Sequence, residues 1–214
     1  MKSRNKQHVV ELLKKTSSER GLKMLEIERK FLYSGNIDDT TLAGAEVCLL
    51  IIQWYLSLPD ARRLRLVVSP GSSKMIETVK TGSGLVREEK EREIPLETLH
   101  EMACRLANER AVVKARYVYP RKRLEGVIDR YFVPNIGFVI EIETSQTRNV
   151  IPDPWKFWDL PAKYFIEVTD NPVYTARSLA ITIDNTVRPL PPNIPFVEPL
   201  QRWRFERYLS IVYG

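Results

Sequence analysis

Histidine and cysteine are both scarce in this chain, and this restricts the metal sites that it can build. Its 214 residues include only two histidines, His8 and His100. Because a site with several imidazole ligands needs more, any metal bound within one chain must be held by carboxylates, which favours Mg²⁺, Mn²⁺ or Ca²⁺. The two cysteines, Cys48 and Cys104, sit within apolar patterns, so we expect buried free thiols.

Long apolar runs are also missing. The longest is residues 47–52, far below the ~20 residues of a membrane-spanning helix. The basic N-terminal residues are too often interrupted by charge to form a secretory signal, so we expect no membrane association and a cytoplasmic location. With 43% hydrophobic and 28% charged residues, the composition predicts a chain that folds by itself. The net charge of +6 suggests an anionic partner and leaves nucleic acid, lipid and phosphate open.

Hydrophobic alternation with a period of two predicts a β-rich domain. The β-favouring segments are residues 25–32, 47–56, 63–69, 75–80, 85–94, 112–119, 125–132 and 137–143. Eight such segments suggest a barrel or a sandwich. A helix is expected after Pro95, and a second one from Asn171 and Pro172, with Leu179 and Ile183 facing the core.

Several segments outside this pattern have their own character. Residues 6–15 predict a short amphipathic helix, and residues 188–199 are proline-rich and should be extended. Residues 201–214 interleave aromatic and arginine side chains, which can bind nucleic acid, although a docked amphipathic element is the favoured interpretation. Trp155 and Trp158 could cover a site as a flap, but packing is the commoner role of such tryptophans.

Ionisable residues recur two apart within the segments that otherwise look like buried strands. Because side chains alternate along a strand, each set points to one side of the sheet. Either that side is exposed to water while helices cover the apolar side, or the sheet closes and the charges line a wet interior. Arginines suit phosphate oxygens and paired carboxylates suit a hard cation, so phosphate with metal accounts for both sets. The sets are Glu26, Glu28 and Lys30; Arg63 and Arg65; Arg87, Glu89 and Glu91; Lys114 and Arg116; and Glu141 and Glu143, with Lys80 and Asp129 added.

These motifs, in this order, resemble the CYTH domain of the triphosphate tunnel metalloenzyme superfamily over about residues 24–184. The sequence departs from the family pattern R-Y-[ST]-N at the start of the last helix, where Val173 stands in place of Arg and Ala176 in place of Asn. The matching motifs are E-x-E-x-K at residues 26–30, QWYL at 53–56, R-x-R at 63–65, T-x-K at 78–80, R-x-E-x-E-x-E-I at 87–94, K-x-R at 114–116, Asp129, and E-x-E at 141–143.

The resemblance implies an α+β fold, a closed eight-stranded antiparallel β-barrel with helices packed outside. Residues 24–184 would form this tunnel domain, and residues 1–23 and 185–214 would be appendages. The resemblance also implies roles for the charged residues. Triphosphate would be bound by Lys30, Arg63, Arg65, Lys80, Arg87, Lys114 and Arg116; Mg²⁺ or Mn²⁺ by Glu26, Glu28, Glu89, Glu91, Glu141 and Glu143; and catalysis would involve Glu26, Glu28, Lys30 and Asp129.

The expected activity is metal-dependent hydrolysis of inorganic tripolyphosphate or of another short organic or nucleoside triphosphate. Two alternatives stay open. One is a class IV adenylate cyclase that makes cyclic AMP from ATP, although such cyclases often carry a His-Phe pair where residues 18–25 read SERGLKML. The other is a non-enzymatic module that binds triphosphates or RNA 5′ ends. The expected partner is a triphosphate-containing small molecule; nucleic acid is less favoured, and a homodimer is left open.

Overall fold

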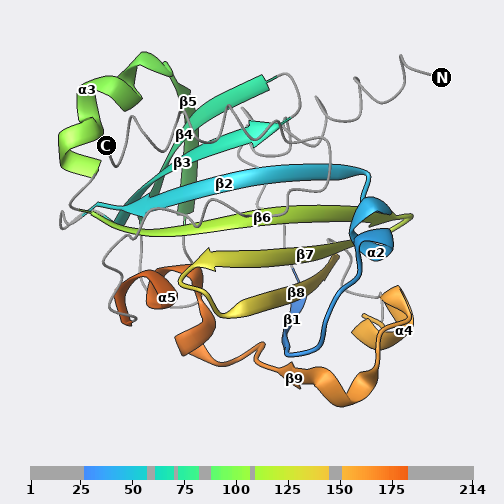
Figure 1. Cartoon of the computed structure of the whole chain (residues 1–214). Helices are drawn as coiled ribbons and strands as arrows, with labels where there is room; N and C mark the ends of the chain where they lie inside the picture. The colour runs from blue at the N-terminus through green and yellow to red at the C-terminus, as the bar shows by residue number, and fades with distance from the viewer. Residues whose placement is uncertain are drawn as a thin grey trace.

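One antiparallel sheet dominates the computed structural model, which describes residues 27–56, 61–69, 72–81, 88–106, 109–144 and 151–182. Its nine strands lie in the order β5-β4-β3-β2-β6-β7-β8-β1-β9. The sheet is strongly curled, so that β5 runs steeply across β2 and β6 (Figure 1). The strands are β1 (Ile27–Tyr33), β2 (Val47–Tyr55), β3 (Ala61–Ser69), β4 (Ser72–Thr81), β5 (Glu88–Ile94), β6 (Arg110–Arg121), β7 (Leu124–Val133), β8 (Gly137–Thr144) and β9 (Phe165–Glu167).

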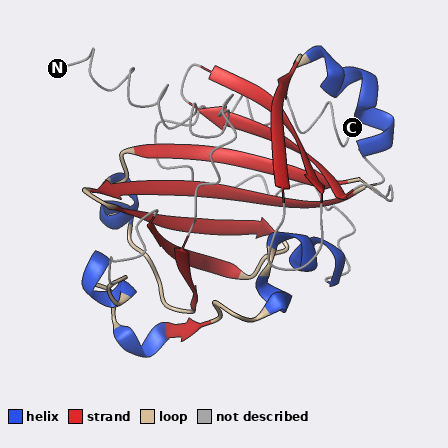
Figure 2. Cartoon of the chain, turned by 180° about the vertical axis from the view of Figure 1, so that it is seen from behind, coloured by secondary structure: helices blue, strands red, loops and turns tan. Residues whose placement is uncertain are grey.

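The helices are short and lie around the margins of the sheet (Figure 2). They are α2 (Asp39–Ala43), α3 (Glu97–Leu106), α4 (Pro154–Trp158) and α5 (Ala176–Thr182), with 3₁₀ turns at Ala162–Tyr164 and Pro172–Tyr174. In the part of the chain that the structure describes, none of them is long and apolar enough to cross a membrane. The cytoplasmic location stays a prediction.

Alternation along the strands gives the sheet one apolar face. Its buried side chains include Leu50, Ile52 and Trp54 of β2 and Leu64 and Leu66 of β3. Helices α2, α3 and α4 add further apolar side chains to the same cluster. Burying each Leu or Ile contributes on the order of 1.5–3 kcal/mol, so this face supplies most of the driving force for folding. The free thiol of Cys48 is also buried here, as predicted, and burial raises its pKa to about 12. The side chain of Cys104 lies outside the described residues.

Helix α4 packs on this apolar face through its aromatic side chains. The Trp158 ring meets Tyr119 edge to face, with the ring centroids 5.6 Å apart, and lies 4.3 Å from the Phe157 ring. Trp155 contacts the Phe165 ring at 6.0 Å. The packing role of the two tryptophans is therefore confirmed, and the flap interpretation is not needed.

Gly126 of β7 lies directly beneath α4. A Cβ atom at this position would be 2.5 Å from the Phe157 ring and 2.7 Å from the Trp158 ring. We expect Gly126→Ala to lower the free energy of unfolding by about 1–3 kcal/mol, because α4 would have to move away from the sheet. Urea denaturation measures this change. Gly44→Ala is the control, because its nearest contact is a backbone oxygen at 3.2 Å and no aromatic side chain is that close; equal losses in both variants would contradict the packing argument.

Helix α5 packs on the opposite face of the sheet. Leu179 and Ala180 form a buried cluster with Val112, Tyr131 and Val139. In Figure 1, α5 lies near one end of β7 and β8, away from α4. The predicted orientation of Leu179 toward a core is confirmed, whereas Ile183 lies outside the described residues.

The predicted start of this helix is wrong by one turn. The Asn171 side chain accepts a hydrogen bond from the Val173 N–H at 3.1 Å, but it caps only the 3₁₀ turn. The backbone then becomes extended at Thr175, whose hydroxyl oxygen accepts the Ser178 N–H at 3.1 Å. Two successive capping residues therefore compete, and the second one begins α5.

The antiparallel sheet with helices outside it is confirmed, and each predicted strand overlaps an observed one. The ninth strand, β9, was not predicted. Among the described strands, β5 and β9 are the two edges of the sheet, so closure into an eight-stranded barrel is not shown by this pairing. The predicted appendages, residues 1–23 and 185–214, lie outside the described residues.

Candidate functional site

The strand register brings the predicted charged residues to one face of the sheet. Glu28 lies opposite Glu143, and Lys30 lies opposite Glu141. Residues directly opposite each other in an antiparallel pair point to the same side, so the faces can be followed from strand to strand. The face that carries α5 holds Glu28, Lys30, Arg63, Arg65, Glu91, Lys114, Arg116, Asp129, Glu141 and Glu143, and we call it the charged face.

A network of ion pairs, the Asp129 cluster, joins Lys30, Lys114, Arg116, Asp129 and Glu141 on this face. Lys114 Nζ lies 2.6 Å from Asp129 Oδ2, and Arg116 donates from Nε to Oδ1 at 2.8 Å and from Nη2 to Oδ2 at 2.7 Å. Arg116 Nη2 also reaches Glu141 Oε2 at 3.2 Å. Lys30 Nζ contacts the other Glu141 oxygen at 3.1 Å. Four strands, β1, β6, β7 and β8, thus contribute to one polar network.

Attraction between opposite charges in the Asp129 cluster competes with burial and with repulsion between the cations. Burial raises the pKa of the Asp129 carboxyl, but the attraction of Arg116 and Lys114 outweighs it and lowers this pKa to about 2. Burial and repulsion by Arg116 lower the pKa of Lys114, against the attraction of Asp129. For Lys30, the attraction of Glu141 and Glu28 outweighs burial and raises the pKa. The Asp129 side chain is 0% exposed, so it is an anion held entirely by the two cations above it.

A second network, the Glu91 cluster, consists of Arg63, Arg65, Thr78 and Glu91 on strands β3, β4 and β5. Arg63 Nη2 lies 3.4 Å from Glu91 Oε1, and Arg65 donates to the same oxygen. The Thr78 hydroxyl donates to this oxygen at 3.0 Å, and it accepts from Arg65 Nη2 at 3.3 Å. Both arginines are therefore held with their guanidinium groups on the charged face.

The charged face also carries neutral polar side chains that the sequence analysis did not assign to the site. The Gln53 amide donates to the Tyr55 hydroxyl, and the two residues lie opposite Arg65 and Arg63 in the register. Burial raises the pKa of Tyr55 to about 12, against the attraction of Arg63. Tyr131 lies beneath Lys114, with Nζ 5.2 Å from the ring centroid. A search for Asp, Glu, Lys and Arg alone missed these residues. For Gln53 and Tyr55 the signal was their spacing of two in β2, which places them on the same face as Arg65 and Arg63.

Four of the predicted site residues cannot be placed with their side chains. Glu26 and Arg87 lie outside the described residues. The backbone positions of Lys80 and Glu89 lie opposite each other in the register of β4 and β5, on the charged face, but their side chains are not described. The roles expected for these four residues stay predictions.

The donor chemistry of the charged face fits a hard divalent cation. Glu28, Glu141 and Glu143 offer carboxylate oxygens from two paired strands, which is the ligand type that Mg²⁺ and Mn²⁺ prefer. Within the described ranges, however, no three acidic, histidine or cysteine side chains converge as a ready metal site. Glu141 is instead held by Lys30 and Arg116. The residues therefore have the ligand chemistry that such a metal ion needs, and binding of the ion would have to compete with the ion pairs of Glu141.

Comparisons with known proteins agree with the fold and identify the family. The inorganic triphosphatase of Acetivibrio thermocellus is 30% identical over 156 residues, which span 72% of this chain and 92% of that protein. The chain therefore belongs to the CYTH group of triphosphate tunnel metalloenzymes, as its motifs indicated. No family model matches the chain.

Solved structures support the fold. The crystal structure of the inorganic triphosphatase NE1496 is 24% identical, with a TM-score of 0.50, and the match covers 76% of this chain and 99% of that one. A proposed adenylate cyclase from Bacillus halodurans is 11% identical, with a TM-score of 0.37 over 63% of this chain and 97% of that one. The second likeness is too distant to carry an argument about activity.

Proposed function

We propose that this protein is a metal-dependent triphosphatase that hydrolyses inorganic tripolyphosphate or another short triphosphate. The observation that carries the proposal is the convergence of Arg and Lys side chains with carboxylates on one face of the sheet. The relative from Acetivibrio thermocellus, named as an inorganic triphosphatase, supports it. Phosphoryl transfer needs mainly positioning and neutralisation of charge, which such a face can supply without a covalent nucleophile.

We assign the cations to substrate binding. Arg63 and Arg65 would bind phosphate oxygens from β3, and Lys30, Lys114 and Arg116 would bind them from β1 and β6. Arginine offers planar paired donors that match phosphate oxygens, and lysine contributes a compact charge. Because these side chains are already held by Asp129, Glu91 and Glu141, they need little reorganisation when the anion binds.

We assign the carboxylates to the metal. Glu141 and Glu143 would hold one Mg²⁺ or Mn²⁺ ion, with Glu28 opposite them on β1. Glu26, Glu89 and Glu91 are candidates for a second ion. When bound, the metal would neutralise phosphate charge and lower the pKa of a water molecule that attacks the terminal phosphate. For Asp129 we propose positioning instead of direct catalysis, because its carboxylate is fully buried under Lys114 and Arg116.

We also propose that the curled sheet surrounds its substrate as a tunnel. The steep course of β5 relative to β2 and β6 supports this arrangement (Figure 1). The packing of α5 on the charged face covers part of it from the side opposite to α4. A tunnel would exclude water from the bound phosphates and strengthen every ionic contact to them.

One assay separates the candidate functions. The purified protein is incubated with tripolyphosphate or ATP and Mg²⁺ or Mn²⁺, and phosphate and cyclic AMP are measured together. Phosphate release from tripolyphosphate is the expected result. Cyclic AMP from ATP would instead identify a cyclase, and tight binding without any product would identify a binding module; either outcome overturns the proposed hydrolysis.

Arg65→Gln should weaken substrate binding more than turnover. Its guanidinium is held in the Glu91 cluster and would donate charged hydrogen bonds to a phosphate group of the substrate. Losing this contact with the substrate should raise KM by about tenfold or more. Steady-state kinetics with tripolyphosphate measures the change. Arg62→Gln is the matched control, since Arg62 neighbours this region but pairs with Glu77 on the apolar face. Equal KM values for the two variants would contradict the assignment of Arg65.

A further inference from the structure

One end of the charged face is covered by α5, and this helix brings residues that belong to no strand close to the site. Leu179 and Ala180 are buried against Val112, Tyr131 and Val139. Tyr55 packs against the same cluster. Since Tyr131 and Tyr55 lie beside Lys114 and Arg63 on the charged face, α5 borders both the Asp129 cluster and the Glu91 cluster.

The cation that α5 contributes here is Arg177. Its neighbour Ala176 and Tyr55 pack against the same buried cluster, so Arg177 lies in the turn of α5 that is close to Tyr55. Burial raises the pKa of Tyr55, and the positive charges of Arg63, Arg65 and Arg177 partly oppose this rise. Arg63 and Arg65 already share the Glu91 carboxylate. Arg177 is exposed and makes no ion pair with any residue that the structure describes.

The Arg177 side chain is exposed at this end of the charged face, beside the two arginines that we assign to phosphate binding. A phosphate group bound by Arg63 and Arg65 would bring further negative charge to the α5 end of the charged face, where the Arg177 guanidinium would donate to it. The hydroxyl of Tyr55, which stays protonated at neutral pH because burial raises its pKa to about 12, could donate to the same oxygens.

We propose that Arg177 is a further substrate-binding residue, which contacts the phosphate groups held by Arg63 and Arg65 at the α5 end of the charged face. This inference rests on the proposed binding of a triphosphate. The role of Arg177 would extend the site from the strands to helix α5. The alternation of charges along the strands cannot reveal a site residue in a helix. Leu179 and Ala180 are the buried residues of α5, so the packing of this helix on the sheet does not depend on the exposed Arg177 side chain.

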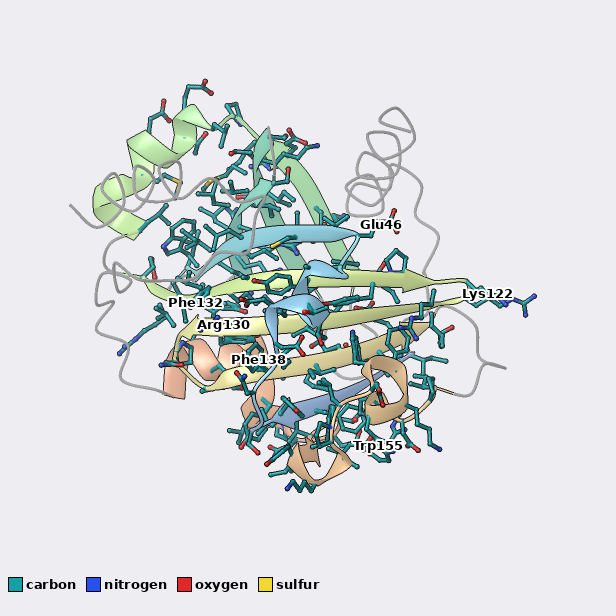
Figure 3. The ribbon with its side chains drawn as sticks, turned by 45° about the vertical axis from the view of Figure 1, so that its right-hand side comes forward. Glu46, Lys122, Arg130, Phe132, Phe138 and Trp155 are labelled. Carbon is teal, nitrogen blue, oxygen red and sulfur yellow. The ribbon has the colours of Figure 1, made fainter. Side chains whose placement is uncertain are left out.

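The test compares Arg177→Gln with Arg177→Lys and with a matched control, Arg130→Gln. Arg130 lies on the other face of the sheet, 5.5 Å from the Phe132 ring centroid and 5.8 Å from that of Phe138 (Figure 3). Each variant is examined by steady-state kinetics with tripolyphosphate, by calorimetric titration with tripolyphosphate, and by thermal melting. The control removes the same charge from the molecule without touching the charged face.

For Arg177→Gln we expect KM and the dissociation constant of tripolyphosphate to rise about tenfold, because one charged donor to phosphate is lost. The turnover number and the melting temperature should stay close to those of the unchanged protein. Arg177→Lys should recover part of the affinity, and Arg130→Gln should behave like the unchanged protein. Equal affinities in Arg177→Gln and Arg130→Gln would overturn the proposal.

The titration separates this inference from the proposed function. Binding of tripolyphosphate that weakens in Arg177→Gln, without hydrolysis by the unchanged protein, would refute the triphosphatase and support the role of Arg177. Hydrolysis that is unaffected by Arg177→Gln would refute only the role of Arg177. Failure of the unchanged protein to bind tripolyphosphate would refute both.

Discussion

Asp129→Asn is expected to lower the free energy of unfolding by about 3–5 kcal/mol, because it leaves two cations without their buried counter-charge. The Asp129 side chain is 0% exposed and accepts hydrogen bonds from both Lys114 and Arg116. The amide of Asn cannot accept all of these bonds and carries no charge. Urea denaturation of the variant at neutral pH measures the loss.

The control for this variant is Asp153→Asn. Asp153 is 32% exposed and contacts Arg29 at 3.4 Å, so solvent screens this pair and its loss should cost about 1 kcal/mol or less. A loss in Asp129→Asn as small as that in Asp153→Asn would contradict the account of the Asp129 cluster.

The same carboxylate predicts how stability depends on pH. The folded-state pKa of Asp129 is lowered to about 2, whereas an unfolded Asp titrates near about 3.9. The contribution of Asp129 to the free energy of unfolding is therefore fully present above pH 4 and is lost as the pH falls through about 2. The reason is that Asp129 takes up its proton at a higher pH in the unfolded chain than in the folded protein. Stability measured between pH 5 and pH 2 should fall less steeply in Asp129→Asn than in the unchanged protein.

Glu143→Gln should abolish most of the metal-dependent turnover, with kcat falling on the order of 10²–10³-fold or more. Glu143 lies opposite Glu28, next to Glu141 along β8, and is only partly buried. Replacing it therefore removes a proposed metal ligand without leaving a fully buried charge alone. Phosphate release is measured over a range of Mn²⁺ concentrations, together with the melting temperature.

Glu101→Gln, on the exposed side of α3, is the matched control and should leave kcat unchanged. Turnover in Glu143→Gln equal to that of this control would remove Glu143 from the site. A fall in turnover accompanied by a lower melting temperature would instead indicate a structural role.

Much of the sheet could be predicted from the sequence because its signal is local. A period of two in the strands gives both the strand and the side to which each charge points, so Glu28, Lys30, Arg116 and Glu141 were expected on one face and are found there. The register that brings them together is long-range, but the alternation of apolar residues allows few others. The assigned roles of these residues are proposals that the kinetics above can test.

The elements that sequence analysis missed are short or depend on tertiary contacts. β9 has three residues and exists because β1 offers it a free edge. α2 and α4 have five residues each, too few for a helical pattern to show. Tyr55 is uncharged and was passed over, although its register in β2 places it opposite Arg63. Arg177 belongs to no strand, so the alternation of charges could not reveal it, and the packing of α5 is what brings it toward the charged face.

The pairing of β1 with β8 has a consequence for how the protein becomes active. β1 is the first described strand along the chain and β8 is the eighth, so closing the long loop between them is expected to be among the slowest steps of folding. During synthesis β1 leaves the ribosome first but must wait for β8 before it can form its ladder. We therefore expect Glu28 and Lys30 to join the site last, so that recovery of activity after dilution from urea would report the completion of the whole sheet.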